Sequence, residues 1–84
     1  MDGEGKEVPR ETARRVLQAA AVEAHGGAGV HVSHARVMER ADMVDWEGFK
    51  AIAGYLERRG WIADAAAGYD VFTVTKSGVD EAMK

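Results

Sequence analysis

The chain has 84 residues, a length that suits one domain with a small core. Its 11 basic and 14 acidic residues give a formal net charge of −3, and the absence of cysteine excludes disulfides and cysteine-based zinc sites. The longest uninterrupted apolar run, Ala19–Val22, is far shorter than the ~20 residues that a membrane span needs. The polar, acidic start is unlike a signal peptide. We therefore expect a cytoplasmic protein with no membrane partner.

Residues 1–8 combine three acidic residues with one lysine and offer almost nothing to bury. This composition favours a short disordered N-terminal arm. The domain itself is then expected over residues 9–84.

The first helix is predicted to begin near Pro9, at the first helical position, where the missing N–H of proline costs nothing. Glu11 then lies in the first turn, where a negative charge suits the helix dipole. One apolar stripe follows at helical spacing: Ala13, Val16, Leu17, Ala20, Ala21 and Ala24. The helix is expected to end at His25-Gly26-Gly27, because glycine adopts the left-handed cap conformation.

A short strand is predicted at residues 30–32, followed by a second helix over residues 34–42 with Ser33 as its cap. Its expected apolar positions are Ala35, Val37, Met38 and Ala41. Asp45 is a suitable cap for a third helix over residues 46–59, which Gly60 ends. The expected buried stripe of this helix is Phe49, Ile52, Ala53 and Leu56.

After Gly60 the pattern changes to short segments rich in aromatic and β-branched residues. Residues 61–64 and 69–75 are predicted to be the two strands of a hairpin, with a turn at residues 65–68. Ser77-Gly78-Val79-Asp80 has capping-box spacing and predicts a short last helix. Packing three helices together with the hairpin on one side buries every stripe, which is an α+β architecture.

Two segments resemble the winged helix-turn-helix superfamily, and the resemblance covers residues 9–84. Tyr55-Leu56-Glu57-Arg58-Arg59-Gly60-Trp61-Ile62 is similar to the end of the recognition helix running into the first wing strand. Phe72-Thr73-Val74-Thr75-Lys76-Ser77-Gly78-Val79 is similar to the second wing strand and the turn into the next helix. The resemblance implies a winged helix: a three-helix core with a short strand, a C-terminal β-hairpin wing and a short final helix.

The resemblance further implies a small DNA-binding transcriptional regulator, whose recognition helix over residues 46–59 enters the major groove of double-stranded DNA. The exposed candidates on this helix are Trp46, Glu47, Lys50, Ala51 and Gly54. Trp46 and Glu47 are expected to face the groove and Lys50 to contact phosphates. Ser33, His34 and Arg36, at the start of the second helix, are expected near phosphates. Glu47 is suited to accept a hydrogen bond from a cytosine amino group.

The charge pattern leaves an alternative open, namely a protein-interaction module on the same fold that binds a protein partner or a second copy. The segment 45–60 has no net charge, and the hairpin over residues 61–75 contains no lysine or arginine. DNA affinity depends largely on such cations. Trp46 and the apolar turn 65–67 would form the contact in this alternative.

No other constellation predicts chemistry. The three histidines are expected to be partly exposed polar residues without zinc, and Gly26–Gly29 lacks the order and the lysine of a phosphate loop. The aromatic residues are mostly expected in the core, and Arg14-Arg15 and Arg58-Arg59 on a solvated face. No catalytic set is present, so we expect neither an enzyme nor a cofactor.

Overall fold

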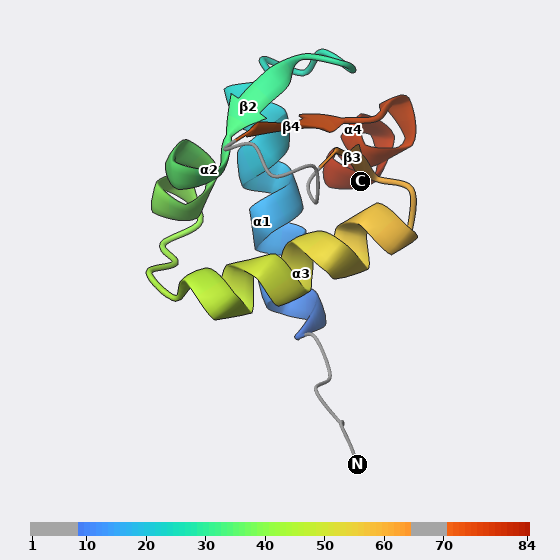
Figure 1. Ribbon diagram of the computed structural model, residues 1–84. Helices are drawn as coiled ribbons and strands as arrows, with labels where there is room; N and C mark the ends of the chain where they lie inside the picture. Colours follow the sequence, from blue (N-terminus) through green and yellow to red (C-terminus); the bar gives the residue numbers. More distant parts are fainter. Residues whose placement is uncertain (1–8, 65–70) are drawn as a thin grey trace.

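The computed structural model describes residues 9–64 and 71–84. Over these residues the chain is a small α+β domain with four helices and a three-stranded antiparallel sheet. Figure 1 shows α1 among the other helices, with α2 and α4 on opposite sides of it and α3 running across it. The predicted arm over residues 1–8 lies outside the described residues.

Helix α1 spans Arg10–Glu23 and buries the predicted stripe, including Val16 and Leu17. Pro9 is the N-cap and not the first helical residue, so the expected start is wrong by one position. The backbone of Pro9 is extended, with ψ at 120°, and the Pro9 carbonyl accepts the N–H of Ala13. At the other end Gly26 has φ +74°, the left-handed conformation expected of a glycine after a helix.

Strand β2 spans His31–Ser33, and helix α2 follows at once over His34–Arg40. Ser33 is the N-cap, as predicted, and its side-chain oxygen accepts the N–H of Arg36 at 3.4 Å. The expected apolar face of α2 is wrong in one respect, because Ala35 is exposed and His34 is buried in its place. The first residue of α2, His34, therefore points into the core, against the rings of Phe49 and Phe72.

Helix α3 spans Trp46–Arg58 and buries the predicted stripe of Phe49, Ile52, Ala53 and Leu56. Asp45 holds the N-cap position, although its side chain makes no capping hydrogen bond within the described structure.

Strands β3, Ile62–Ala63, and β4, Val71–Val74, pair antiparallel with Ile62 opposite Val74. Strand β2 lies on the other side of β4, with Val32 opposite Phe72, so the sheet order is β2-β4-β3. The predicted hairpin is confirmed for these strands. Its predicted turn, residues 65–68, lies outside the described residues.

Helix α4 spans Lys76–Ala82 and is capped by Thr75, not by the predicted Ser77. The Thr75 hydroxyl accepts the N–H of Gly78 at 3.0 Å and donates to the carbonyl of Gly60 at 2.6 Å. This second bond ties the start of α4 to the end of α3. Ser77 is the second residue of α4, so it lies inside the helix and is not its N-cap.

The core lies where α1 packs against α2, α3 and α4, and where the sheet closes over the helices. Its largest fully buried side chains are Phe49, Phe72, Leu17, Leu56, Ile62, Val16, Val37 and Val74. In the two described stretches, no helix combines the length and apolar character that crossing a bilayer demands.

Candidate functional site

The N-terminal half of α3 brings together three residues predicted to face DNA: Trp46, Glu47 and Lys50. Glu47 Oε2 and Lys50 Nζ lie 3.7 Å apart as an ion pair. Lys50 Nζ also lies 6.0 Å from the centroid of the Trp46 ring. Trp46 is 43% exposed, as the sequence predicts. These residues form one surface cluster with an aromatic face and one charge of each sign.

His34 does not belong to that surface. Its side chain is buried, with ring centroids 5.6 Å from Trp46, 5.6 Å from Phe49 and 5.1 Å from Phe72. The expectation that His34 is partly exposed is therefore wrong, and its position near a DNA phosphate stays a prediction. Because the ring packs against α3 and β4, it fixes the start of α2 beside the start of α3.

Arg36 is held by an acidic residue of α1. Its Nε lies 3.2 Å from Glu23 Oε1, and Arg40 Nε lies 2.8 Å from Glu23 Oε2. The single carboxylate thus bridges two turns of α2. Nevertheless, the Arg36 side chain is 71% exposed, so it faces solvent while it is paired.

The electrostatics of Glu23 follow from this bridge. The hydrogen bond from Arg40 holds the pKa of Glu23 below its ordinary value of 4.5, and Arg36 acts in the same direction. Loss of solvent around the carboxyl opposes them and raises the pKa. Because the carboxylate stays ionised at neutral pH, part of the positive charge on α2 is neutralised.

Ser33 is the remaining predicted residue. Its side-chain oxygen is engaged in capping α2, so its proximity to a phosphate stays a prediction. The structure thus joins Ser33 with Arg36, and Trp46 with Glu47 and Lys50.

The histidines do not form a metal site in the described part of the chain. His25 and His31 are exposed, as expected, whereas His34 is buried. Within residues 9–64 and 71–84, no group of three or more His, Cys, Asp or Glu side chains could hold a metal ion.

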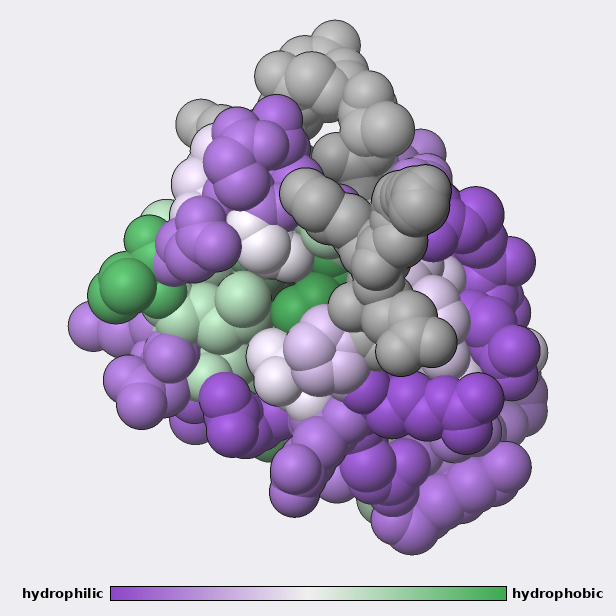
Figure 2. Space-filling model, turned by 90° about the horizontal axis from the view of Figure 1, so that it is seen from below, coloured by the Kyte–Doolittle hydropathy of each residue, from purple (hydrophilic) through white to green (hydrophobic). Residues whose placement is uncertain are grey.

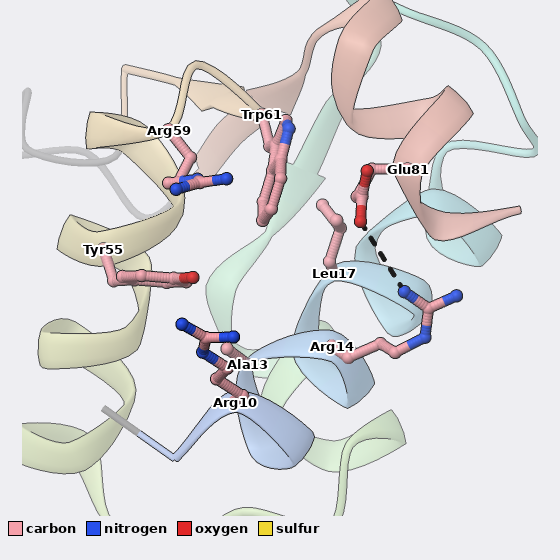
Figure 3. Close-up of a pocket in the computed structure, with 8 residues that line it drawn as sticks. All are labelled: Arg10, Ala13, Arg14, Leu17, Tyr55, Arg59, Trp61 and Glu81. Carbon is pink, nitrogen blue, oxygen red and sulfur yellow. Dashed lines mark ion pairs between the residues drawn. The ribbon is translucent and has the colours of Figure 1, made fainter. Parts of the chain in front are cut away.

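A second site escaped the sequence analysis. A pocket of about 340 Å³ lies between α1, the C-terminal end of α3 and α4 (Figure 3). It is lined by Arg10, Ala13, Arg14, Leu17, Tyr55, Arg59, Trp61 and Glu81. Arg15, Arg58 and Arg59 are exposed, as expected, and Arg14 is half-buried. The sequence analysis did not predict that Arg14 and Arg59 share a pocket. The one feature of the sequence that points to this pocket is the spacing of Arg10 and Arg14, because residues four apart lie on the same face of a helix.

Comparison of the chain with protein-family models, curated proteins and solved structures found no match.

Proposed function

We propose that residues 9–84 form a winged-helix domain that binds double-stranded DNA and regulates transcription without catalysis. The observation that carries this proposal is the order of elements: helix, strand, two helices, a two-stranded hairpin and a last helix. The sheet order β2-β4-β3 also fits, because the first strand joins the hairpin. In the proposed winged helix, α3 would be the recognition helix.

The exposed face of α3 supports the proposal by its shape. Glu47, Lys50, Ala51 and Arg58 are exposed, whereas Phe49 and its stripe are buried. Small residues in the middle of the exposed face allow a close approach of the helix. The major groove, which is about 12 Å wide, admits an α-helix.

The charges set the expected strength of binding. The Glu47–Lys50 pair is well exposed, with side-chain exposures of 80% and 53%. Such pairs contribute little to stability, so a DNA phosphate can replace Glu47 as the partner of Lys50. With Lys50, Arg36 and Arg58 as cations, the log–log salt slope of binding would be only about −3.

The test is fluorescence anisotropy of a labelled mixed-sequence duplex at about 50 and about 200 mM salt. Lys50→Gln should weaken binding and reduce the salt slope by about 1. Lys76→Gln is the matched control, because Lys76 is an exposed lysine at the start of α4. Equal losses in both variants, or no binding of the native chain at low salt, would refute the proposal.

A second candidate function is protein interaction, and exposed apolar residues favour it. Val44 is 97% exposed and Trp46 is 43% exposed at the turn between α2 and α3. Figure 2 shows a hydrophobic area on the lower face of the molecule, with hydrophilic residues around it. We propose a second copy of the chain as the partner. Sedimentation of the native chain and of Val44→Asp tests this: a dimer that Val44→Asp dissociates supports it, and a native monomer at high concentration contradicts it.

A further inference from the structure

The pocket between α1, α3 and α4 gathers positive charge from distant parts of the chain. Figure 3 shows the guanidinium groups of Arg10 and Arg59 and the ring of Tyr55 directed toward one space. Arg14 lies on the far side of the same space, beside Glu81. Three arginines and one glutamate leave this pocket with a formal charge of +2.

The carboxylate of Glu81 neutralises only part of the positive charge of the three arginines. It pairs with Arg14 at 3.8 Å and with Lys84, which lies outside the pocket, at 3.1 Å. In the described part of the chain, neither Arg10 nor Arg59 has a carboxylate partner. Arg10 and Arg14 are also one helical turn apart, a like-charge spacing that destabilises a helix. An anion in the pocket would relieve this repulsion.

The remaining walls are apolar and aromatic. Leu17 and Ala13 are buried and form a floor without charge. Tyr55 and Trp61 meet edge to face, with ring centroids 6.3 Å apart. Arg59 is held over the Trp61 ring, with Cζ 4.9 Å from the centroid. This contact fixes a guanidinium group at the rim, and the tyrosine hydroxyl adds a further hydrogen-bond donor.

We infer that this pocket binds a small aromatic phosphate monoester, a class that includes nucleoside monophosphates. The guanidinium fork matches a phosphate, and a dianion would balance the charge of +2. An aromatic or apolar body would contact Leu17 and Trp61. The volume of about 340 Å³ suits a small ligand, since ligand pockets span about 300–1,000 Å³. This inference does not depend on DNA binding, because the pocket lies at the opposite end of α3 from Lys50.

The two tryptophans of the chain provide an internal comparison. Trp61 lines the pocket, whereas Trp46 lies at the start of α3, about 20 Å from Arg59 along the helix. The experiment follows both indole N–H signals by NMR while the ¹⁵N-labelled chain is titrated with phenyl phosphate at constant ionic strength. We expect a saturable shift of the Trp61 signal and no shift of the Trp46 signal. Phenol and inorganic phosphate should each bind more weakly than phenyl phosphate.

A matched pair of variants tests the arginine cluster. Arg10→Gln should weaken phenyl phosphate binding about tenfold, the cost of losing one charge-assisted hydrogen bond. Arg15→Gln removes the same charge from an exposed position of α1 outside the pocket, and should leave affinity unchanged. Neither arginine has an ion pair in the described structure, so both variants should fold.

Four outcomes would overturn the inference. The first is a Trp61 signal that does not shift saturably, and the second is equal weakening by Arg10→Gln and Arg15→Gln. The third is inorganic phosphate binding as tightly as phenyl phosphate, which would leave no role for the aromatic walls. The fourth is displacement of phenyl phosphate by a DNA duplex, which would make the arginine cluster part of a DNA surface.

Discussion

The close packing of α4 against the end of α3 predicts that Gly78→Ala destabilises the domain. A Cβ added at Gly78 would lie 2.0 Å from the carbonyl oxygen of Trp61 and 2.9 Å from Val74 Cγ1. The carbonyl belongs to the backbone, so it cannot rotate away as a flexible side chain can. Either α4 or the chain around Trp61 must move, and both are fixed by the Thr75 hydroxyl that bonds both segments.

The magnitude follows from two opposing effects. Alanine has the higher helix propensity, which would stabilise α4 by about 1 kcal/mol. Overpacking a tight contact costs typically about 1–3 kcal/mol, and a 2.0 Å approach belongs at or above the upper end. The net result is a loss of at least about 2 kcal/mol in the free energy of unfolding.

Gly54→Ala is the matched control, because it makes the same change in α3. Its added Cβ would meet Arg58 Nη1 at 3.5 Å, an ordinary contact with a flexible side chain. Here the propensity acts alone, and we expect a gain of up to about 1 kcal/mol. Thermal unfolding followed by circular dichroism should show melting temperatures that move in opposite directions, by about 4–8 °C per kcal/mol. If Gly78→Ala is as stable as Gly54→Ala, then α4 does not pack this closely on Trp61.

Other contacts lead to three further predictions. Thr75→Ala should cost about 1–2 kcal/mol in a chemical denaturation and Ser33→Ala less, because only Thr75 also bonds the Gly60 carbonyl and its capping bond is the shorter. The lowered pKa of Glu23 means that its carboxylate stabilises the fold at neutral pH and that this stability is lost as the pH falls through and below 4.5; melting curves of Glu23→Gln should therefore depend less on pH in that range than those of the native chain. Phe72→Ala removes a fully buried ring, and a loss of about 3–5 kcal/mol should leave little cooperative unfolding in a calorimeter.

The regular elements could be predicted because their signals are local. The stripes of α1 and α3 repeat at helical spacing, and Ser33 and Asp45 are cap residues directly before a helix. The hairpin strands are short, but their aromatic and β-branched residues distinguish them from the helices. Each of these patterns needs only the residues within the element itself.

The wrong predictions concern features that depend on contacts between residues far apart in the sequence. Ser77 fits the local capping pattern, yet Thr75 is the cap because it also reaches the carbonyl of Gly60. His34 has the polarity of a surface residue, but side chains from α3 and β4 close around it. No count of residues along the chain reveals these neighbours.

The arginine pocket could not be predicted for the same reason. Arg10 and Arg14 are visible as a pair on one face of α1, but Arg59 and Trp61 come from the other half of the chain. Only the crossing of α1 and α3 brings the two parts together.

The positions of the arginines in the fold also affect the proposed DNA binding. As a sequence, residues 10–42 are a mildly basic stretch with a net charge of +1. The fold separates its cations, since Arg10 and Arg14 line the pocket while Arg36 and Arg40 share Glu23. Few unpaired cations then remain near α3 for phosphates, so nonspecific DNA affinity should be low. A duplex bound tightly by this surface must therefore be recognised mainly through base contacts of α3 and the shape of the groove.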